Sequence, residues 1–331
     1  MSSVAPVLSV VVPMYNEESV LPLLVARLRP VLDELGESYE VVAVNDGSVD
    51  STAAVLSGMR RIWPELRVLH LRSNSGHQSA LAAGLKRALG DYVVSIDADL
   101  QDPPEVIPEM LGQAREHHLE VVYGVRSNRA TDTIFKRWTA GLYYRLMRRL
   151  VGKKVPSHAG DFRLLSRTTL ETLRELPEPT PIYRLIIPWL GFPSGEVMYT
   201  RECRAAGQTK YSLSKMLRLT ADSVVSFSVI PLRLATWVGL IGFIVCGIMC
   251  IDALVSYLSG HTVTGWTSTF IALSFIGGTQ LLCLGVLGEY VAQIYRTVQG
   301  RPTYQVAYDS LEVGDIYPAQ EPRMNNIISG T

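Results

Sequence analysis

The chain has 331 residues, enough for one large domain with an appendage or for two modest domains. Lys plus Arg and Asp plus Glu both total 31, so the net charge gives no reason to expect a nucleic-acid partner. The four cysteines fit neither a disulfide framework nor a zinc site, because Cys203 stands alone and Cys246, Cys250 and Cys283 lie in apolar segments. We interpret all four as reduced.

From residue 8 onward, short β-rich apolar runs alternate with helical stretches. The predicted strands cover Leu8–Val12, Glu40–Val44, Val68–Leu71, Tyr92–Ile96 and Glu120–Gly124. The predicted helices cover Val20–Leu35, Ser51–Arg61, Gln78–Leu89 and Pro104–His117. This alternation predicts an α/β domain over residues 1–210 with a mostly parallel, helix-covered sheet, in which ligands bind where the strands end.

The composition changes near residue 229, where long uncharged segments begin. Leu234–Ile251 is 18 residues without Asp, Glu, Lys or Arg, and Ala253–Gly288 is 36 more. We therefore expect a two-helix transmembrane hairpin within 229–290, with a buried hairpin of a soluble protein as the alternative. Basic residues flank the pair but not its link, and we see no signal peptide. The first domain and the C-terminus are thus expected on the cytoplasmic face of the plasma (inner) membrane.

Residues 133–154 combine seven basic and no acidic residues with apolar residues at helical spacing. We interpret this segment as an interfacial helix, because basic residues gain from contact with anionic lipid. The alternative is that the apolar stripe packs on the protein core beneath a solvated basic face. A second juxtamembrane helix is expected at 211–228, and a cytoplasmic tail at 291–331 that is poorly ordered after about Ala307.

A cluster of acidic residues follows the fourth predicted strand. Asp97 and Asp99 lie one residue apart, so both can face a crevice if the chain turns there, and Gln101 adds a neutral oxygen. These are hard oxygen ligands suited to Mg²⁺ or Mn²⁺. The alternative is helix capping, a role that Asp102 alone can fill before Pro104.

Two further motifs follow the first and second predicted strands. Asn45–Thr52 contains Asp46, which is placed to accept hydrogen bonds from a base or a ribose. Pro13–Glu17 offers an aromatic side chain and a carboxylate. Each motif alone is also ordinary turn chemistry.

Taken in order, the three motifs resemble family 2 glycosyltransferases, which have the GT-A fold. The resemblance continues with Arg126, with Gly160–Leu164, with Arg204–Tyr211 and through the C-terminal spans, so that it covers residues 8–305. The whole set is similar to the polyprenyl-phosphate glycosyltransferases, which are relatives of dolichyl-phosphate mannose synthase and include bacterial undecaprenyl-phosphate glucosyltransferases. The chain lacks the Gln-x-x-Arg-Trp motif of processive relatives, which favours a single transfer.

The resemblance implies a role for each matching position. The nucleoside is expected near Pro13, Tyr15, Glu17, Val44 and Asp46; the diphosphate and metal near Asp97, Ala98, Asp99 and Gln101; and phosphates near Arg126, Arg204 and Lys210. Independently of the family, a site that joins two anionic reactants needs such cations. Arg126 alone could equally be a surface ion-pair partner.

The implied reaction is an inverting attack by a polyprenyl phosphate oxygen on the anomeric carbon, which expels the nucleoside diphosphate. Asp161 is the catalytic candidate, although a phosphate with a second pKa of about 6 needs little help from a base. Asp161 could instead orient the acceptor or the sugar, or hold Arg163. Acceptor and membrane-surface contacts are expected from Lys136, Arg137, Arg145, Arg148 and Arg163.

Several alternatives stay open. UDP-glucose is the first expectation for the donor, with GDP-mannose or transfer to a hydroxyl-bearing glycolipid as alternatives. A nucleotidyltransferase would usually show a Gly-rich loop after the first strand, and Pro13–Glu17 has no glycine. A non-catalytic nucleotide-sugar-binding protein would not need the full polar set. Small residues in the first span, Gly239, Gly242 and Gly247, would permit a homo-oligomer.

Overall fold

The computed structural model describes residues 5–127, 159–176, 182–200, 230–259 and 265–313. The chain divides into two compact units: Met1–Thr209 with Pro302–Thr331, and Lys210–Arg301. The two expected interfacial segments, at 133–154 and 211–228, lie outside the described residues, as do Arg204 and Lys210.

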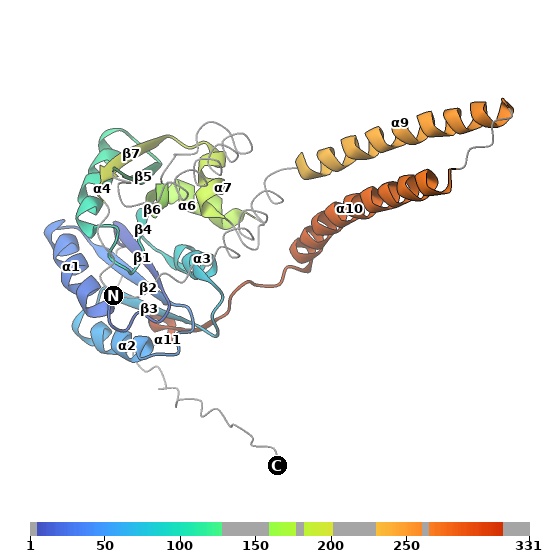
Figure 1. Cartoon of the computed structure of the whole chain (residues 1–331). Coiled ribbons are helices and arrows are strands. Elements are labelled where there is room, and N and C mark those ends of the chain that lie inside the picture. The colour runs from blue at the N-terminus through green and yellow to red at the C-terminus, as the bar shows by residue number, and fades with distance from the viewer. Residues whose placement is uncertain (1–4, 128–158, 177–181, 201–229, 260–264, 314–331) are drawn as a thin grey trace, which may run out of the picture. The chain divides into compact units, whose positions relative to one another are not determined.

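The first unit is built on an eight-stranded sheet of order β7-β5-β6-β4-β1-β2-β3-β8 (Figure 1). Its strands are β1 Leu8–Met14, β2 Tyr39–Asn45, β3 Leu66–Leu71, β4 Tyr92–Ser95, β5 Val121–Arg126, β6 Ala159–Ser166, β7 Ser194–Tyr199 and β8 Val306–Asp309. Neighbours β3, β2, β1 and β4 are parallel, and so are β5 and β7. The α/β class is confirmed, and all five predicted strands are present with ends shifted by at most two residues.

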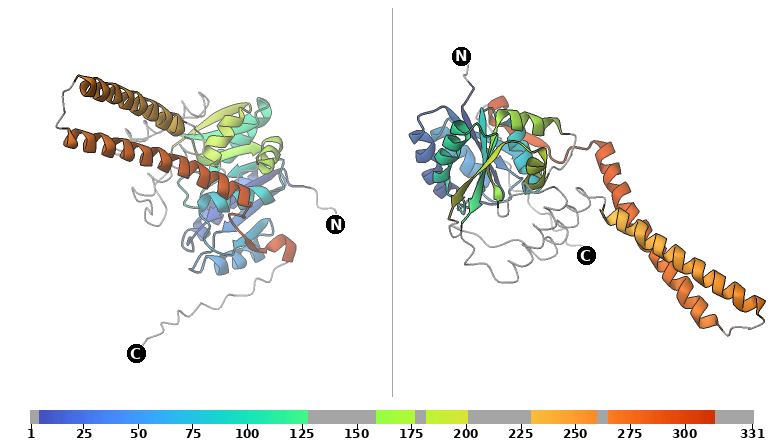
Figure 2. Two further views of the ribbon diagram at one scale, coloured as in Figure 1. Left: turned by 90° about the vertical axis from the view of Figure 1, so that its right-hand side faces the viewer. Right: turned by 90° about the horizontal axis from the view of Figure 1, so that it is seen from above.

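Helices cover both faces of this sheet, as Figure 2 shows. They are α1 Leu21–Glu34, α2 Thr52–Ile62, α3 His77–Arg87, the short 3₁₀ helix η1 Pro104–Val106, α4 Ile107–Glu116, α6 Arg167–Glu175 and α7 Tyr183–Leu190. Alternate side chains of β1 point to opposite faces. Val10 and Val12 join a buried cluster with Leu24 and Leu28 of α1. Every residue of β1 is buried, as expected for a strand with helices on both sides.

Three strands of the sheet were not predicted: β6, β7 and β8, of which β7 pairs in parallel with β5. Strand β6 lies antiparallel between β4 and β5. Strand β8 lies antiparallel to β3 at the edge of the sheet and leads into α11, Ser310–Val313. The expectation of poor order after Ala307 is therefore wrong for residues 307–313. The reason is long-range: Asp309 and Ser310 find buried partners on β3, which local composition does not reveal.

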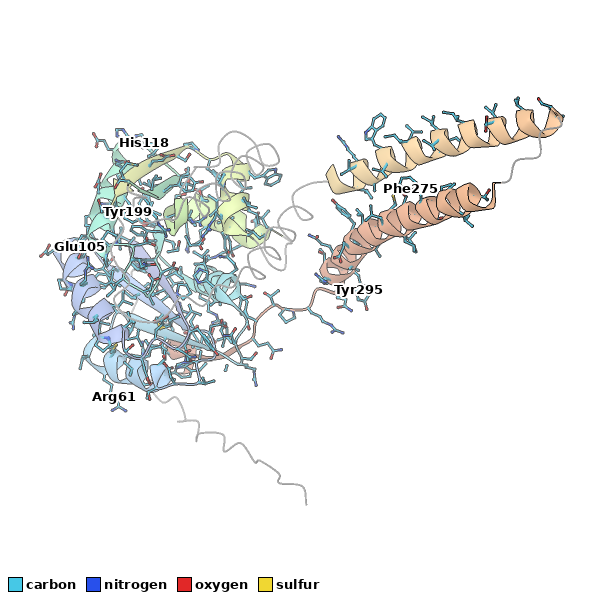
Figure 3. All side chains as sticks on the ribbon, in the orientation of Figure 1. Arg61, Glu105, His118, Tyr199, Phe275 and Tyr295 are labelled. Atoms are coloured by element: carbon cyan, nitrogen blue, oxygen red, sulfur yellow. The ribbon has the colours of Figure 1, made fainter. Side chains whose placement is uncertain are left out.

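The described part of the second unit contains two long helices, α9 Ile230–Leu258 and α10 Trp266–Gln299, which pack against each other. The Sγ of Cys283 lies 3.4 Å from the backbone oxygen of Ala235. Large apolar side chains project from both helices, and Figure 3 labels two of them, Phe275 and Tyr295. Among the described residues, one helical stretch, Phe275–Gln299, is long and apolar enough to cross a bilayer, and a shorter apolar stretch covers Leu232–Val245. One of the two expected spans thus has this support.

Candidate active site

The polar motifs meet at the edge of the sheet where the parallel strands β1, β2 and β4 end. Register pairs Met14 with Asn45 at the ends of β1 and β2, and the backbone N–H of Asp46 donates to the oxygen of Met14 (2.9 Å). Asp97 follows the last residue of β4 by two positions, and its side chain is 35% exposed. The topology therefore brings the three motifs together at one edge.

Strand β6 adds Asp161 to this edge because it runs antiparallel to β4. Ser95, the last residue of β4, pairs in register with Arg163, so Asp161 lies just beyond the end of β4. The hydroxyl of Ser95 also donates to the backbone oxygen of Asp161 (2.5 Å). This register places Asp161 beside the loop that carries Asp97.

Asp161 is held by three cationic or ionisable side chains. Its Oδ1 lies 2.6 Å from Nη2 of Arg163, and its Oδ2 lies 2.9 Å from Nη2 of Arg184 and 3.5 Å from Nε2 of His77. Burial alone would raise the pKa of Asp161, but Arg184, His77 and Arg163 outweigh it and hold that pKa well below its usual range. A carboxylate stabilised this strongly is a weak proton acceptor, which favours an orienting role over that of a general base.

His77 was missed by the sequence analysis, although it lies between Asp97 and Asp161. Its Nε2 lies 3.6 Å from Oδ1 of Asp97 and 3.5 Å from Oδ2 of Asp161. Burial disfavours the charged imidazolium and lowers the pKa of His77. The hydrogen bond to Asp161 and the charge of Asp97 outweigh this effect, so the pKa of His77 is raised. A single histidine after Gly76 carries no local signal of function, because its partners come from the loop after β4 and from β6.

The carboxyl of Asp97 is more easily protonated than an ordinary one. Burial raises its pKa to about 6, with smaller contributions in the same direction from Asp161, Asp102 and Asp99, while His77 acts in the opposite direction. Such a concentration of like charge is typical of a site that receives a cation.

The metal ligands proposed from the sequence lie on a tight turn. Leu100 has φ +56°, a conformation that few residues other than glycine adopt, and this reverses the chain between Asp99 and Gln101. The backbone N–H of Gln101 donates to Oδ1 of Asp99 (3.2 Å). Within the described residues, no group of three or more His, Cys, Asp or Glu is arranged to hold a metal ion. The donor set still fits one, because Asp97, Asp99 and Gln101 are partly exposed oxygen ligands that a diphosphate can complete.

Asp46 has a structural role at the end of β2. It is 2% exposed, and its two carboxylate oxygens accept the backbone N–H groups of Ser75 (2.7 Å) and Gly76 (2.9 Å). The neighbouring Gly47 has φ +64°, and a Cβ there would lie 2.6 Å from the carbonyl carbon of Ser73. These contacts hold the loop before α3 against the sheet, and contact of Asp46 with a base or ribose stays a prediction.

Arg126 is fixed by a second buried aspartate. Its Nη2 lies 3.6 Å from Oδ1 of Asp102, and its Nε donates to the hydroxyl of Tyr199 (3.3 Å). Tyr199, the last residue of β7 and labelled in Figure 3, in turn donates to Asp102. Helix capping by Asp102 is therefore wrong: the cap position of η1 is Pro103, without a side-chain hydrogen bond. Tyr199 is a second residue that the sequence analysis missed.

The other expected site residues fall into three groups. Tyr15 and Glu17 are partly exposed, whereas Pro13, Val44 and Ala98 are buried, which leaves their backbone for ligand contact. The expected surface position of Arg163 is wrong, because its side chain is 2% exposed and packs in the core on Asp161. The remaining basic candidates lie outside the described residues: Lys136, Arg137, Arg145, Arg148, Arg204 and Lys210.

Comparison with known proteins agrees with this arrangement. Residues 9–174 match the profile of Glycosyl transferase family 2. An uncharacterised glycosyltransferase of Bacillus subtilis (strain 168), YkcC, is 41% identical over 302 residues, which cover 90% of this chain and 92% of that protein. The bactoprenol glucosyl transferase of Shigella phage SfII is 38% identical over 301 residues, covering 90% of this chain and 96% of that protein.

A third relative is the prophage bactoprenol glucosyl transferase homologue of Escherichia coli (strain K12). It is 36% identical over 301 residues, covering 90% of this chain and 97% of that protein. These alignments extend well beyond residues 9–174. The chain therefore belongs to glycosyltransferase family 2, with a GT-A-like domain that carries the Asp97 and Asp161 site.

Proposed function

We propose that the protein transfers one sugar, with inversion, from a nucleotide diphosphate sugar to a polyprenyl phosphate on the cytoplasmic face of the membrane. UDP-glucose is the proposed donor. The observation that carries this proposal is the strand-end site, in which the acidic pair Asp97 and Asp99 lies beside a carboxylate held by two arginines. Relatives that match nearly the whole chain and are named bactoprenol glucosyl transferases support the acceptor class.

In the reaction, the bond from the anomeric carbon to the diphosphate oxygen breaks and a bond to the acceptor phosphate oxygen forms. The electron pair leaves with the nucleoside diphosphate, so stabilisation of that leaving group is the main requirement. Asp97, Asp99 and Gln101 would hold a Mg²⁺ or Mn²⁺ ion, which supplies positive charge to the diphosphate. Arg126, oriented by Asp102 and Tyr199, would add a guanidinium on the same anion.

No general base is required in this scheme. A phosphate monoester with a second pKa of about 6 is largely a dianion at neutral pH and attacks without losing a proton. Asp161 stays ionised through its arginines and would orient neighbouring groups instead of accepting a proton. The same fact disfavours transfer to a lipid hydroxyl, which needs a base to remove the proton.

The second unit is proposed to anchor the enzyme in the membrane that contains its lipid acceptor. The proposal assigns α9 and α10 to two membrane spans, because both expose rows of large apolar side chains, for example Trp237 (63%) and Phe243 (76%) on α9 and Leu281 (72%) on α10. A lipid phosphate sits at headgroup level, so an anchored enzyme searches for it in two dimensions and in a restricted orientation. The expected basic segment at 133–154 would hold the domain against anionic lipid.

The test is a transfer assay with the purified full-length protein, undecaprenyl phosphate and Mg²⁺ or Mn²⁺. Radiolabelled UDP-glucose and GDP-mannose are compared as donors. We expect label from UDP-glucose in an acid-labile lipid phosphate, and at least about 100-fold less with Asp97→Asn. Asp91→Asn is the matched control, since Asp91 is exposed just before the other end of β4. Label in an acid-stable lipid, or transfer to no lipid, would refute the proposal.

A further inference from the structure

The loop that follows β1, residues 15–20, lies where the order of the strands changes direction. From β1 the chain passes to β2 and then to β3 on one side, and it returns to β4 on the other side of β1. In parallel α/β sheets, ligands bind outside the strand ends at such a point. The position of this loop therefore affects the shape of the site.

Asn16 joins this loop to the loop after β2, residues 46–51, through both its backbone and its side chain. Its N–H donates to Oγ of Ser48 (2.9 Å), and its Oδ1 accepts the N–H of Val49 (2.9 Å). The backbone of Asn16 is left-handed, with φ +56°, a conformation that asparagine and aspartate tolerate better than most residues other than glycine. Position 16 thus combines a backbone conformation with a side-chain acceptor that few residue types supply together.

The two residues after Asn16 are held by the same neighbouring segment and by the start of α2. The N–H of Glu17 donates to Oγ1 of Thr52 (3.0 Å), and the N–H of Glu18 donates to Oδ2 of Asp50 (3.3 Å). In return, Oε2 of Glu18 accepts the N–H of Ser51 (2.8 Å). Three consecutive backbone amides of the first loop therefore donate to side chains of the second segment.

These contacts indicate which part of a nucleotide sugar the paired loops suit. Loops that bind phosphate present backbone N–H groups to the anion. Here the N–H groups of residues 16–18 donate to protein side chains instead, and the carboxylates of Glu18 and Asp50 lie among them. Negative charge at this place disfavours a neighbouring phosphate. The paired loops therefore suit the uncharged nucleoside, whereas the proposed diphosphate and metal site lies at Asp97 and Asp99.

We propose that Asn16 is a positioning residue for the donor. It holds the loop after β1 against the loop after β2 in the conformation that receives the nucleoside of the nucleotide sugar. This inference rests on the proposed function for the class of donor. Asn16 acts through its neighbours Tyr15 and Glu17, the positions at which nucleoside contacts are predicted. A loop that is fixed before binding loses less conformational entropy on binding, so loss of Asn16 should weaken donor binding and leave the chemical step unchanged.

The experiment measures binding of UDP, with GDP in parallel, to the full-length protein in detergent by isothermal titration calorimetry. Asn16→Ala and Asn16→Gly both lack the side-chain acceptor and should weaken nucleotide binding by about 10-fold or more. The glycine variant adopts the left-handed backbone without strain, so its loss isolates the contribution of the side chain. Asn16→Asp keeps an acceptor oxygen and tolerates the same backbone conformation, and it should bind within about 3-fold of wild type.

The matched control is His118→Ala. His118, labelled in Figure 3, is exposed in the turn before β5 and also has a left-handed backbone, with φ +51°. This variant should bind nucleotide like wild type. In the transfer assay, Asn16→Gly should raise the KM for the nucleotide sugar and leave kcat and the KM for the lipid phosphate unchanged. A general folding defect would instead lower the apparent kcat and leave both KM values unchanged.

Wild-type affinity in Asn16→Gly, or an equal loss of affinity in Asn16→Asp, would overturn the inference. A wild-type protein that binds neither UDP nor GDP would overturn it as well. Failure of the proposed function would show separately, as Asn16-dependent nucleotide binding without transfer of sugar to undecaprenyl phosphate.

Discussion

Two buried aspartates in the first unit are each held by two arginines, yet their surroundings give them different roles. Asp309 on β8 lies 2.7 Å from Arg67 and 2.6 Å from Arg87. Asp161 on β6 lies 2.6 Å from Arg163 and 2.9 Å from Arg184. Each aspartate thus has two arginine partners, so this pairing alone does not tell a structural ion pair from a functional one.

The difference lies in what surrounds the arginines. At Asp309, Arg87 also meets Glu312 and Arg67 lies 3.9 Å from Glu40, so three carboxylates face two guanidiniums. Arg67 further donates to the backbone oxygen of Arg87 (2.7 Å). That cluster is closed on itself and fastens β8 to the sheet. The Asp161 cluster keeps a partly exposed arginine, Arg184, and lies at the strand ends beside Asp97, which are features of a binding site.

Helix α3 connects the two clusters. Its first residue, His77, lies beside Asp161, and its last residue, Arg87, lies beside Asp309. Eleven helical residues span about 16 Å, so one short rigid element sets the separation of the site from the structural clamp. The comparison therefore predicts separable effects for the same substitution at the two aspartates.

The largest effect is expected on stability from Asp309→Asn. The Asp309 side chain is fully buried, and removing one partner of a buried ion pair typically costs about 3–5 kcal/mol because the arginines are left uncompensated. Denaturant unfolding of the full-length protein measures this loss. Turnover per folded molecule should stay at the wild-type level. A stable variant with impaired transfer would contradict the structural role of this cluster.

The next effect is expected on activity from Asp161→Asn. Loss of this carboxylate releases Arg184 and His77 from their shared anchor, and we expect transfer to fall by about 100- to 1000-fold, comparable to the loss of one preorganised electrostatic group. The rate is measured with the folded fraction determined in parallel, and Asp309→Asn serves as the matched control. Near-normal turnover of Asp161→Asn would remove Asp161 from the site.

The smallest effect is expected on the stability of the folded protein at acid pH, through His70 on the β8 side of the sheet. His70 on β3 is buried against Tyr308, and burial lowers its pKa from the ordinary 6.5 to about 4. As pH falls below 6.5, the unfolded chain takes up this proton before the folded one does, so folding is destabilised down to about pH 4. Between pH 7 and pH 5, His70 is expected to lower the free energy of unfolding by about 1–2 kcal/mol.

The substitution His70→Gln tests this expectation, because it removes the contribution of His70 to the pH dependence of the unfolding free energy. Unfolding free energies are compared between pH 7 and pH 5 for wild type and variant. His77 contributes with the opposite sign, because its raised pKa makes the folded state bind the proton first, and it is present in both proteins. An unchanged slope in the variant would show that His70 does not titrate in this way.

Much of the parallel half of the sheet was predictable, because its signals are local. The apolar runs of β1, β2 and β4 and the turn residues that follow them specify strand ends, and parallel strands bring those ends together. The sequence alone therefore predicts that Asp97, Asp99 and Asp46 lie at strand ends on one edge of the sheet. Arg163 was misplaced because a charged residue in a short motif looks exposed, whereas its strand β6 is covered on both sides.

By itself, the sequence determined the α/β class, the family and the acidic loop after β4, since strand periodicity and turn chemistry act over a few residues. Only the tertiary structure decided that His77, Tyr199 and Arg184 join the site and that Asp309 closes the far edge of the sheet. Those contacts join residues 20 to 242 positions apart, and they depend on the antiparallel insertion of β6 and the return of β8. Pairing between strands that are distant in the sequence depends on the packing of the whole domain. A local sequence pattern therefore does not predict which side chains this pairing brings together.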